Sequence, residues 1–200
     1  MAIYFARHGK TEFGEKHCFE GVSDSNLTIL GKDQARRLGE MLKDKNINRI
    51  ISSPRGRAQQ TAEIVSQILK IDMEIDETWR EMSYGQWDGQ AKENLKNLPE
   101  WSVREKNKYY FLHPGVANGI PGESYDHLYN IIKPAIEKLK EDFPKENIVI
   151  ISHIGILRSV NKHFNNLSSE EITDFSPSNE EMIKLTKGAD DKIKLEIIKY

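Results

Sequence analysis

The sequence has little that would suggest a secreted, disulfide-bonded or membrane-spanning protein. Cys18 is the only cysteine among the 200 residues, so no intrachain disulfide can form and zinc sites built from several thiolates are excluded. No apolar run approaches the length of a membrane span. The apolar residues 2–6 end at Arg7 and are too short for the core of a signal peptide. We therefore expect a cytoplasmic protein.

The sequence also lacks an excess of charge of either sign. The 29 Lys and Arg residues and 31 Asp and Glu residues leave a net charge of −2, which argues against general affinity for nucleic acids or anionic membranes. Any site for an anion must therefore be local. There is no internal repeat and no low-complexity segment, and a chain of this length is expected to form one domain, 1–200.

Short apolar runs alternate with helical patterns along the chain. The runs at residues 2–6, 48–52 and 147–152 predict buried strands, and two later strands are expected at 181–186 and 192–200. Amphipathic patterns predict helices at 28–45, after residue 53, at 124–143 and after residue 153. This alternation predicts an α/β fold, a three-layer sandwich with a mostly parallel central sheet and helices on both faces.

Two helices carry boundary signals. Ser53 is expected to be the N-cap of the second helix, with Pro54 at its first helical position. Pro134 lies inside the predicted helix 124–143 and is expected to kink or interrupt it, because proline lacks the backbone N–H that a helix interior uses.

The ends of three predicted strands carry polar residues. Arg7 and His8 follow the first strand, Ser53 and then Arg57 follow the second, and His153 follows the third. Ligands of parallel sheets bind beyond the carboxyl ends of the strands. If the three strands lie side by side, two histidines and two arginines converge on one crevice.

Such a group of residues is suited to a phosphate dianion. Arginine offers a charged planar fork that matches phosphate oxygens, and neutral histidine can attack phosphorus. Backbone N–H groups at the helix start near Gly155 would add donors. A single histidine at a strand end is usually structural, but three coinciding strand ends favour a phosphoryl-transfer site. His17, His127 and His163 have no partners that indicate metal ligation, so we expect neither metal nor cofactor.

Six ordered blocks of the sequence resemble the histidine phosphatase, or phosphoglycerate mutase-like, superfamily. The family signature usually reads Arg-His-Gly-Glu/Gln-Thr/Ser. The blocks of this chain are Arg7-His8-Gly9-Lys10-Thr11; 21–28 with Gly31 and Gln34-Ala35; Ser52-Ser53-Pro54 with 57–62; Arg80-Glu81-Met82 with 84–89; Pro121-Gly122-Glu123-Ser124; and Ser152-His153-Ile154-Gly155. The resemblance spans nearly the whole chain.

The resemblance implies a role for each site residue. His8 would accept the phosphoryl group, and Arg7, Arg57 and His153 would hold the phosphate, together with Gly155. Glu81 would protonate the leaving oxygen and then deprotonate the attacking water. The residues alone do not single out Glu81 among many acidic residues. Arg55 could be mistaken for the second arginine, but the register of residues 57–62 favours Arg57.

The chain departs from the family pattern at four positions near these blocks. Gly14 stands where the family often has Asn, and Glu20 stands where Gln is common. Lys10 replaces an acidic or amide residue, and Ile154 replaces a frequent Gly. None of these changes removes a catalytic role, but they weaken any inference about the identity of the substrate.

The resemblance favours a phosphomonoesterase that acts on a small phosphorylated metabolite. The segment Glu81 to Trp87 looks like the shorter phosphatase branch, which includes the alpha-ribazole phosphatases, rather than the mutases, in which the acid is followed by Arg-His-Tyr-Gly. The alternatives are a cofactor-dependent phosphoglycerate mutase and a non-catalytic phosphate-binding regulatory protein. Sugar phosphates, phosphoglycerates, a nucleotide-like monophosphate and phosphoserine all remain open as substrates, and the protein could be a monomer or a homodimer.

Residues 88–121 are expected to form a lid over the site. Their aromatic residues could stack on a substrate, but local packing is the simpler interpretation. Their basic residues could attract a second anionic group, although a solvated helix face is the more ordinary role. The basic residues concerned are Lys92, Lys96, Arg104, Lys106 and Lys108, and the aromatic ones with the lid histidine are Trp101, Tyr109, Tyr110, Phe111 and His113.

Overall fold

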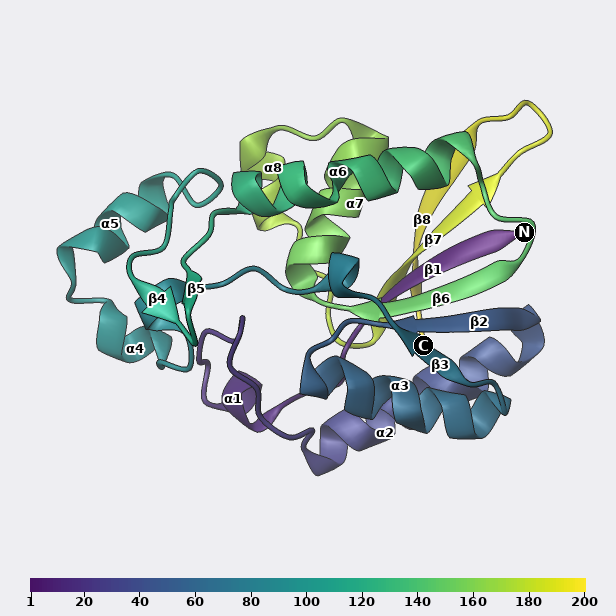
Figure 1. Ribbon diagram of the computed structural model, residues 1–200, viewed down its shortest axis with the longest axis horizontal. Coiled ribbons are helices and arrows are strands. Elements are labelled where there is room, and N and C mark those ends of the chain that lie inside the picture. Colours follow the sequence, from purple (N-terminus) through teal and green to yellow (C-terminus); the bar gives the residue numbers. More distant parts are fainter.

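The computed structural model describes all 200 residues and has one six-stranded sheet with helices on both faces (Figure 1). The strands of the large sheet are β1 (Ala2–Arg7), β2 (Ile47–Ser52), β3 (Met73–Ile75), β6 (Asn147–Ser152), β7 (Glu181–Lys187) and β8 (Ile193–Lys199), and a two-stranded sheet is formed by β4 (Val116–Ala117) and β5 (Ile120–Pro121). The helices are α1 (Glu12–Glu15), α2 (Ile29–Leu42), α3 (Gly56–Leu69), α4 (Lys92–Leu95), α5 (Pro99–Lys106), α6 (Tyr125–Glu141), α7 (Ile154–Asn165) and α8 (Ser169–Asp174).

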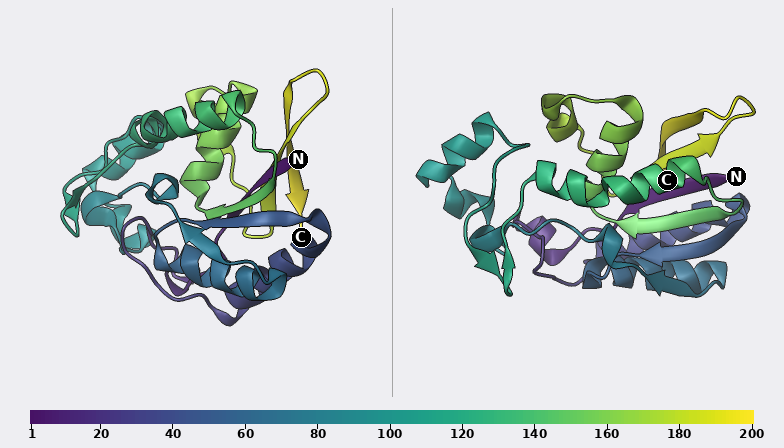
Figure 2. Two further views of the ribbon diagram at one scale, coloured as in Figure 1. Left: turned by 45° about the vertical axis from the view of Figure 1, so that its right-hand side comes forward. Right: turned by 45° about the horizontal axis from the view of Figure 1, so that its top comes forward.

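The large sheet has the strand order β3-β2-β6-β1-β7-β8. The first four of these strands are parallel, β7 runs antiparallel to β1, and β8 runs antiparallel to β7. Helices α2 and α3 cover one face, and α6, α7 and α8 lie on the other (Figures 1 and 2). The predicted three-layer α/β sandwich with a mostly parallel sheet is confirmed.

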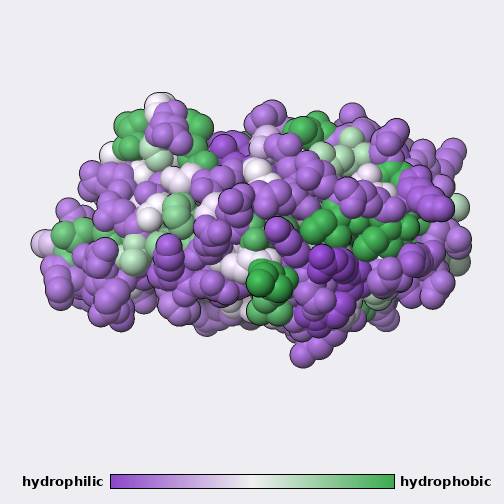
Figure 3. Space-filling view, turned by 90° about the horizontal axis from the view of Figure 1, so that it is seen from below, coloured by the Kyte–Doolittle hydropathy of each residue, from purple (hydrophilic) through white to green (hydrophobic).

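The sheet is buried on both faces because successive side chains of a strand point to opposite sides. On β1, Ile3 and Phe5 join the core beneath α6 and α7, whereas Tyr4 and Ala6 join the core against α2 and α3. The outer side of the α2 and α3 layer is largely hydrophilic, with hydrophobic residues in separated groups (Figure 3). This pattern is that of amphipathic helices that bury one stripe against a sheet.

The five strands expected from the sequence are all present, but the predicted start of α3 was wrong. The helix begins at Gly56 with Arg55 as its N-cap. The Ser53 hydroxyl does not cap the helix: it lies 2.6 Å from His153 Nε2 and accepts the N–H of Arg55, the residue before the helix, at 3.3 Å. The Asp24 carboxylate takes that place instead and accepts the N–H of Gly56 at 2.7 Å. A carboxylate from a distant loop therefore stabilises the helix start.

Pro134 does not interrupt its helix, and α6 runs unbroken from Tyr125 to Glu141. Both Pro134 and Asn130, the residue one turn earlier, are exposed. The carbonyl group that loses its helical partner therefore stays accessible to water, and a proline on this face costs less than one in a buried position.

The elements between β1 and α2 and between residues 88 and 121 gather beyond the carboxyl ends of the parallel strands (Figure 1). They include α1, α4 and α5, which have four to eight residues each, too few for a hydrophobic period to reveal them in the sequence. No helix of the molecule is both long and apolar enough to cross a membrane.

The loop after β1 packs against the first turn of α2 with almost no space between the two backbones. A Cβ atom on Gly31 would lie 2.0 Å from the carbonyl oxygen of Lys10, and one on Gly9 would lie 2.3 Å from the carbonyl oxygen of Gly31. Both glycines are therefore needed to place the residues that follow β1 against α2.

We predict that Gly31→Ala lowers the free energy of unfolding by about 1–3 kcal/mol, because two backbone segments would have to separate. Gly56→Ala is the matched control, since its new Cβ would meet only Asp24 at an ordinary 3.5 Å. Its effect should stay within about 0.5 kcal/mol. Urea denaturation of both variants measures the difference, and equal effects would contradict the predicted contact.

Candidate active site

Strand β6 lies between β2 and β1, so the residues that follow these three strands meet at one edge of the sheet. His8 follows β1, His153 follows β6 and Ser53 follows β2. The two histidine rings have centroids 5.2 Å apart, and the Ser53 hydroxyl contacts His153 Nε2 at 2.6 Å. Both rings are buried. The structure thus brings together the two histidines that the sequence placed at separate strand ends.

His8 is held through both of its ring nitrogens. Its Nδ1 lies 2.9 Å from the carbonyl oxygen of Gly9, and its Nε2 faces the Nε–H of Arg57 at 3.3 Å. These partners assign the proton to Nδ1 and a lone pair to Nε2. Burial, together with the charges of Arg57 and Arg7, holds the pKa of His8 well below its ordinary value. The imidazole is therefore neutral near pH 7.

Arg57 is completely buried and all its N–H groups have partners. Its Nη1 donates to Asp24 Oδ1 at 2.8 Å and to the carbonyl of residue 23 at 3.0 Å. Its Nη2 donates to the carbonyls of residues 20 and 21 at 2.8 and 3.1 Å. The guanidinium group therefore joins α3, the loop 20–24 and His8.

Arg7 is different, because its guanidinium group has no hydrogen-bond partner within the protein. Its Nε is buried and unpaired, and the side chain lines the cavity beside His8. Burial lowers the pKa of Arg7, and the nearby Glu81 opposes that effect; a guanidinium nonetheless keeps its charge in proteins. Arg55, the alternative considered from the sequence, is the N-cap of α3 and does not line the cavity.

Glu81 is buried and pinned by two backbone groups. Its Oε1 accepts the N–H of Met82 at 2.9 Å, and its Oε2 accepts the N–H of Gly155 at 3.2 Å. Burial raises the pKa of Glu81, although these N–H groups, Arg57 and Arg7 oppose the rise. The N–H of Gly155, expected to face phosphate, is therefore engaged by this carboxylate.

Glu123 holds the chain on either side of Glu81. It accepts hydrogen bonds from both Nη atoms of Arg80, at 2.8 and 2.6 Å, and from the backbone N–H of Ser83 at 2.8 Å. Burial alone would raise the pKa of Glu123, but these bonds bring it below the ordinary value. Glu123 stands in a block of the family resemblance, yet the sequence offers no sign that its partner is Arg80.

Two further positioning residues were missed from the sequence. Asp88 accepts the backbone N–H groups of Val22 and Ser23, each at 2.8 Å, and so ties residues 88–121 to the loop that surrounds Arg57. Asn179 donates to the carbonyl oxygen of His8 at 2.6 Å, and the Tyr200 hydroxyl donates to the Asn179 carbonyl at 2.7 Å. Only the structure reveals these partners, because they are far from the site in sequence.

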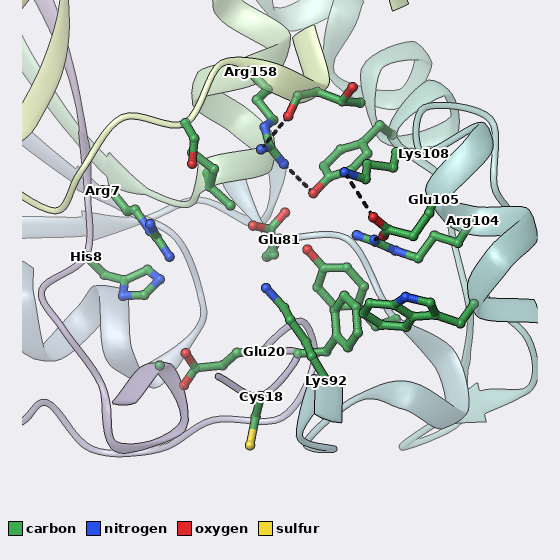
Figure 4. A pocket seen from close by; sticks show the side chains of 18 residues that line it. Arg7, His8, Cys18, Glu20, Glu81, Lys92, Arg104, Glu105, Lys108 and Arg158 are labelled. Atoms are coloured by element: carbon green, nitrogen blue, oxygen red, sulfur yellow. Dashed lines mark hydrogen bonds and ion pairs between the residues drawn. The ribbon is translucent and has the colours of Figure 1, made fainter. Parts of the chain in front are cut away.

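Arg7, His8 and Glu81 line a cavity of about 430 Å³, whereas Arg57 and His153 are not among its lining residues. Arg7 and His8 lie on one side, Arg104 and Lys108 on the other, and the Glu81 carboxylate lies between them (Figure 4). Phe19, Tyr84, Trp101 and Tyr125 also line it. Nowhere does the chain gather three or more His, Cys, Asp or Glu side chains that could hold a metal ion.

The basic residues of the segment 88–121 are divided between this cavity and the outer surface. Lys92, Arg104 and Lys108 line the cavity, and Lys96 and Lys106 do not. The expected solvated helix face was wrong for Arg104, which is buried, whereas Lys92 is exposed. The three that line the cavity come from α4, α5 and the turn after α5. The aromatic residues follow the expected local packing: Trp87 stacks on Trp101 and Phe111 with ring centroids 5.9 and 5.4 Å apart.

Comparison with known proteins gives a match over almost the whole chain. The family profile described as "Histidine phosphatase superfamily (branch 1)" matches residues 3–197. A protein of Hydrogenobacter thermophilus named "Putative phosphoserine phosphatase 2" is 34% identical over 162 residues, which cover 79% of this chain and 75% of that protein. An Escherichia coli protein named "Probable phosphoglycerate mutase GpmB" is 31% identical over 155 residues, 76% of this chain and 69% of that protein.

Solved structures share the fold at lower sequence identity. The alpha-ribazole phosphatase of Shigella flexneri superposes with a TM-score of 0.82 at 22% identity, covering 100% of this chain and 96% of that one. A mycobacterial glucosyl-3-phosphoglycerate phosphatase gives 0.80 at 19% identity, covering 100% and 97%.

The position of Glu81 depends on Gly155, and this dependence can be tested. A Cβ atom on Gly155 would lie 2.2 Å from Glu81 Oε1 and 2.8 Å from Leu128 Cδ2. We predict that Gly155→Ala displaces the carboxylate and lowers kcat by about 100-fold, the cost of a shift of roughly 1 Å at a reacting group. Steady-state kinetics with a phosphate ester measures the effect. Full activity in a folded Gly155→Ala variant would mean that the position of Glu81 does not matter.

Proposed function

This chain belongs to the histidine phosphatase superfamily, and on that premise we propose that it hydrolyses small phosphate monoesters through a phosphohistidine formed at His8. The observation that carries the proposal is that one cavity is lined both by a histidine whose pKa is lowered and by a glutamate whose pKa is raised. His8 is neutral. Glu81, which is buried and has a raised pKa, lies between His8 and the far wall of the cavity, which carries Arg104 and Lys108. Burial therefore favours both a neutral nucleophile and a protonated acid.

In the first half-reaction the phosphate group of the substrate lies against Arg7, whose guanidinium group has no protein partner. His153 Nδ1 is also buried without a partner, and its ring centroid lies 5.2 Å from that of His8, so we assign it as a further donor to this group. His8 Nε2 attacks phosphorus as the bond to the ester oxygen breaks, and Glu81 gives its proton to that oxygen. Arg57 holds His8 Nε2 in line at 3.3 Å and adds positive charge beside the transferring group.

The second half-reaction uses the same residues in reverse roles. Glu81, now a carboxylate, takes a proton from a water molecule whose oxygen attacks phosphorus. The bond between phosphorus and Nε2 breaks, and the electron pair returns to His8. Inorganic phosphate leaves, and both His8 and protonated Glu81 are restored.

The far wall of the cavity supports a substrate that carries a second anionic group. Arg104 and Lys108 lie across the cavity from His8, and Glu105 neutralises part of their charge through contacts of 2.6 and 3.3 Å. Lys92 lines this cavity as well, and it forms no ion pair with a carboxylate. A cavity of about 430 Å³ accommodates a small metabolite. The relative named as a phosphoserine phosphatase fits this class, since phosphoserine bears a carboxylate.

The relative named as a phosphoglycerate mutase keeps a second activity open. A mutase must protect its phosphohistidine from water, whereas a phosphatase must admit water. A binding protein without turnover is the third possibility, but it would not need both His8 and Glu81. We propose hydrolysis in the cytoplasm, in keeping with the single cysteine. Release of phosphate distinguishes hydrolysis from the other two activities, and isomerisation without release distinguishes a mutase from a binding protein.

We predict that the wild-type protein releases phosphate from a panel of phosphomonoesters in the presence of a metal chelator. Esters with a carboxylate or second phosphate should rank above neutral ones, because the far wall is basic. His8→Ala should abolish release, since the nucleophile is lost. Isomerisation without release would favour the mutase, and turnover that persists in His8→Ala would refute His8 as the phosphoryl acceptor.

A second prediction tests Glu81 as the acid. Glu81→Gln should lower kcat/KM for an alkyl phosphate by about 100- to 10,000-fold, because its leaving oxygen needs a proton. For p-nitrophenyl phosphate, whose leaving group departs unprotonated, the loss should be under about tenfold. In wild type, kcat/KM for the alkyl ester should fall as pH rises through the raised pKa of Glu81, and this fall should disappear in Glu81→Gln. Equal losses on both esters would contradict the role.

A further inference from the structure

A second, smaller cavity of about 200 Å³ opens beside His8. It shares Arg7, His8 and Lys92 with the larger cavity but adds Lys10. Glu81 does not line it, so the leaving group of a substrate, which must reach this acid, lies in the larger cavity instead. The smaller cavity is therefore not needed for the leaving group.

The walls of the smaller cavity carry positive charge without a counter-charge. Arg7, Lys10 and Lys92 line it, and no carboxylate does. None of these three residues takes part in any ion pair of the molecule. Loss of water around its ammonium group and the charges of Arg104 and Arg7 lower the pKa of Lys92. Unpaired cations at this density attract an anion.

The backbone fixes Lys10 at this place. Its N–H donates to Gln34 Oε1 at 2.9 Å, and its carbonyl oxygen accepts the N–H of Thr28 at 2.9 Å. The stem of Lys10 passes over Gly14, where an added Cβ would lie 3.7 Å from Lys10 Cδ. Lys10 and Gly14 are two of the positions at which the sequence departs from its family pattern, and the structure places them against each other in this cavity.

We propose that the smaller cavity is a second oxyanion subsite, which takes a phosphate-like group and uses Lys10 as its selective residue. The group is either free inorganic phosphate or a second phosphoryl group of a molecule bound in the catalytic cavity. The subsite rests on the proposed function, because it shares Arg7 and His8 with the site of phosphoryl transfer.

Titration calorimetry with inorganic phosphate and with pyrophosphate tests the subsite without requiring turnover. The variants are Lys10→Gln and, as control, Lys16→Gln, which removes the same charge from an exposed lysine that lines neither cavity. Loss of one charged contact to an oxyanion should weaken binding about tenfold. Unfolding midpoints of both variants show whether each is folded.

If the second group is part of a larger ligand, Lys10→Gln should weaken pyrophosphate binding about tenfold and leave the binding of phosphate unchanged. If the subsite takes free phosphate, wild type should bind two phosphates and Lys10→Gln only one. Equal binding by wild type, Lys10→Gln and Lys16→Gln would overturn the proposal. Absence of ester hydrolysis in wild type would instead refute the proposed function, and the calorimetry would still report on the subsite.

Discussion

The site depends on one buried guanidinium group. Arg57 has no exposed surface, and its five N–H bonds join helix α3, the loop 20–24 and the nitrogen of His8 that faces the cavity. Such a group is stable in the interior only when every donor has an acceptor. The loop must therefore bring its carbonyl groups inward, and Asp24, which binds both Arg57 and the first N–H of α3, fixes the loop to the helix.

Burial explains why the catalytic groups have complementary protonation states. A low-dielectric environment disfavours the charged form of every side chain. For His8 this lowers the pKa and favours the neutral ring, whereas for Glu81 it raises the pKa and favours the protonated carboxyl group. One physical cause thus prepares both the base and the acid. The neighbouring arginines reinforce the effect on His8 but oppose it on Glu81, so the acid remains able to lose its proton.

The sequence was enough to predict the meeting of three strand ends and every strand of the six-stranded sheet except β3. Those features follow from hydrophobic runs and from the rule that parallel strands end at one edge. It was not enough to find the partners of polar side chains from distant segments. Asp24 in place of Ser53 at the start of α3 is one example, because Ser53 was already engaged by His153. Asp88 and Asn179 are two more, since nothing local in the sequence indicates which backbone groups they bind.

The small cavity beside His8 concentrates positive charge in a way that does not stabilise the fold. The whole chain is close to neutral, with a net charge of −2, yet Arg7, Lys10 and Lys92 share one small cavity without a carboxylate. Their mutual repulsion opposes folding, and no ion pair to a carboxylate offsets it, although Glu81 favours the charge of Arg7 and Lys92 lies 5.3 Å from the centre of the Phe19 ring. Arg57 shows that the fold can satisfy an arginine completely, so the unpaired state of Arg7 beside it is a property of the site rather than a defect of packing. Residues that break the local rules of stability without compensation are expected where a ligand supplies the missing partner, and the partner that we propose here is an oxyanion.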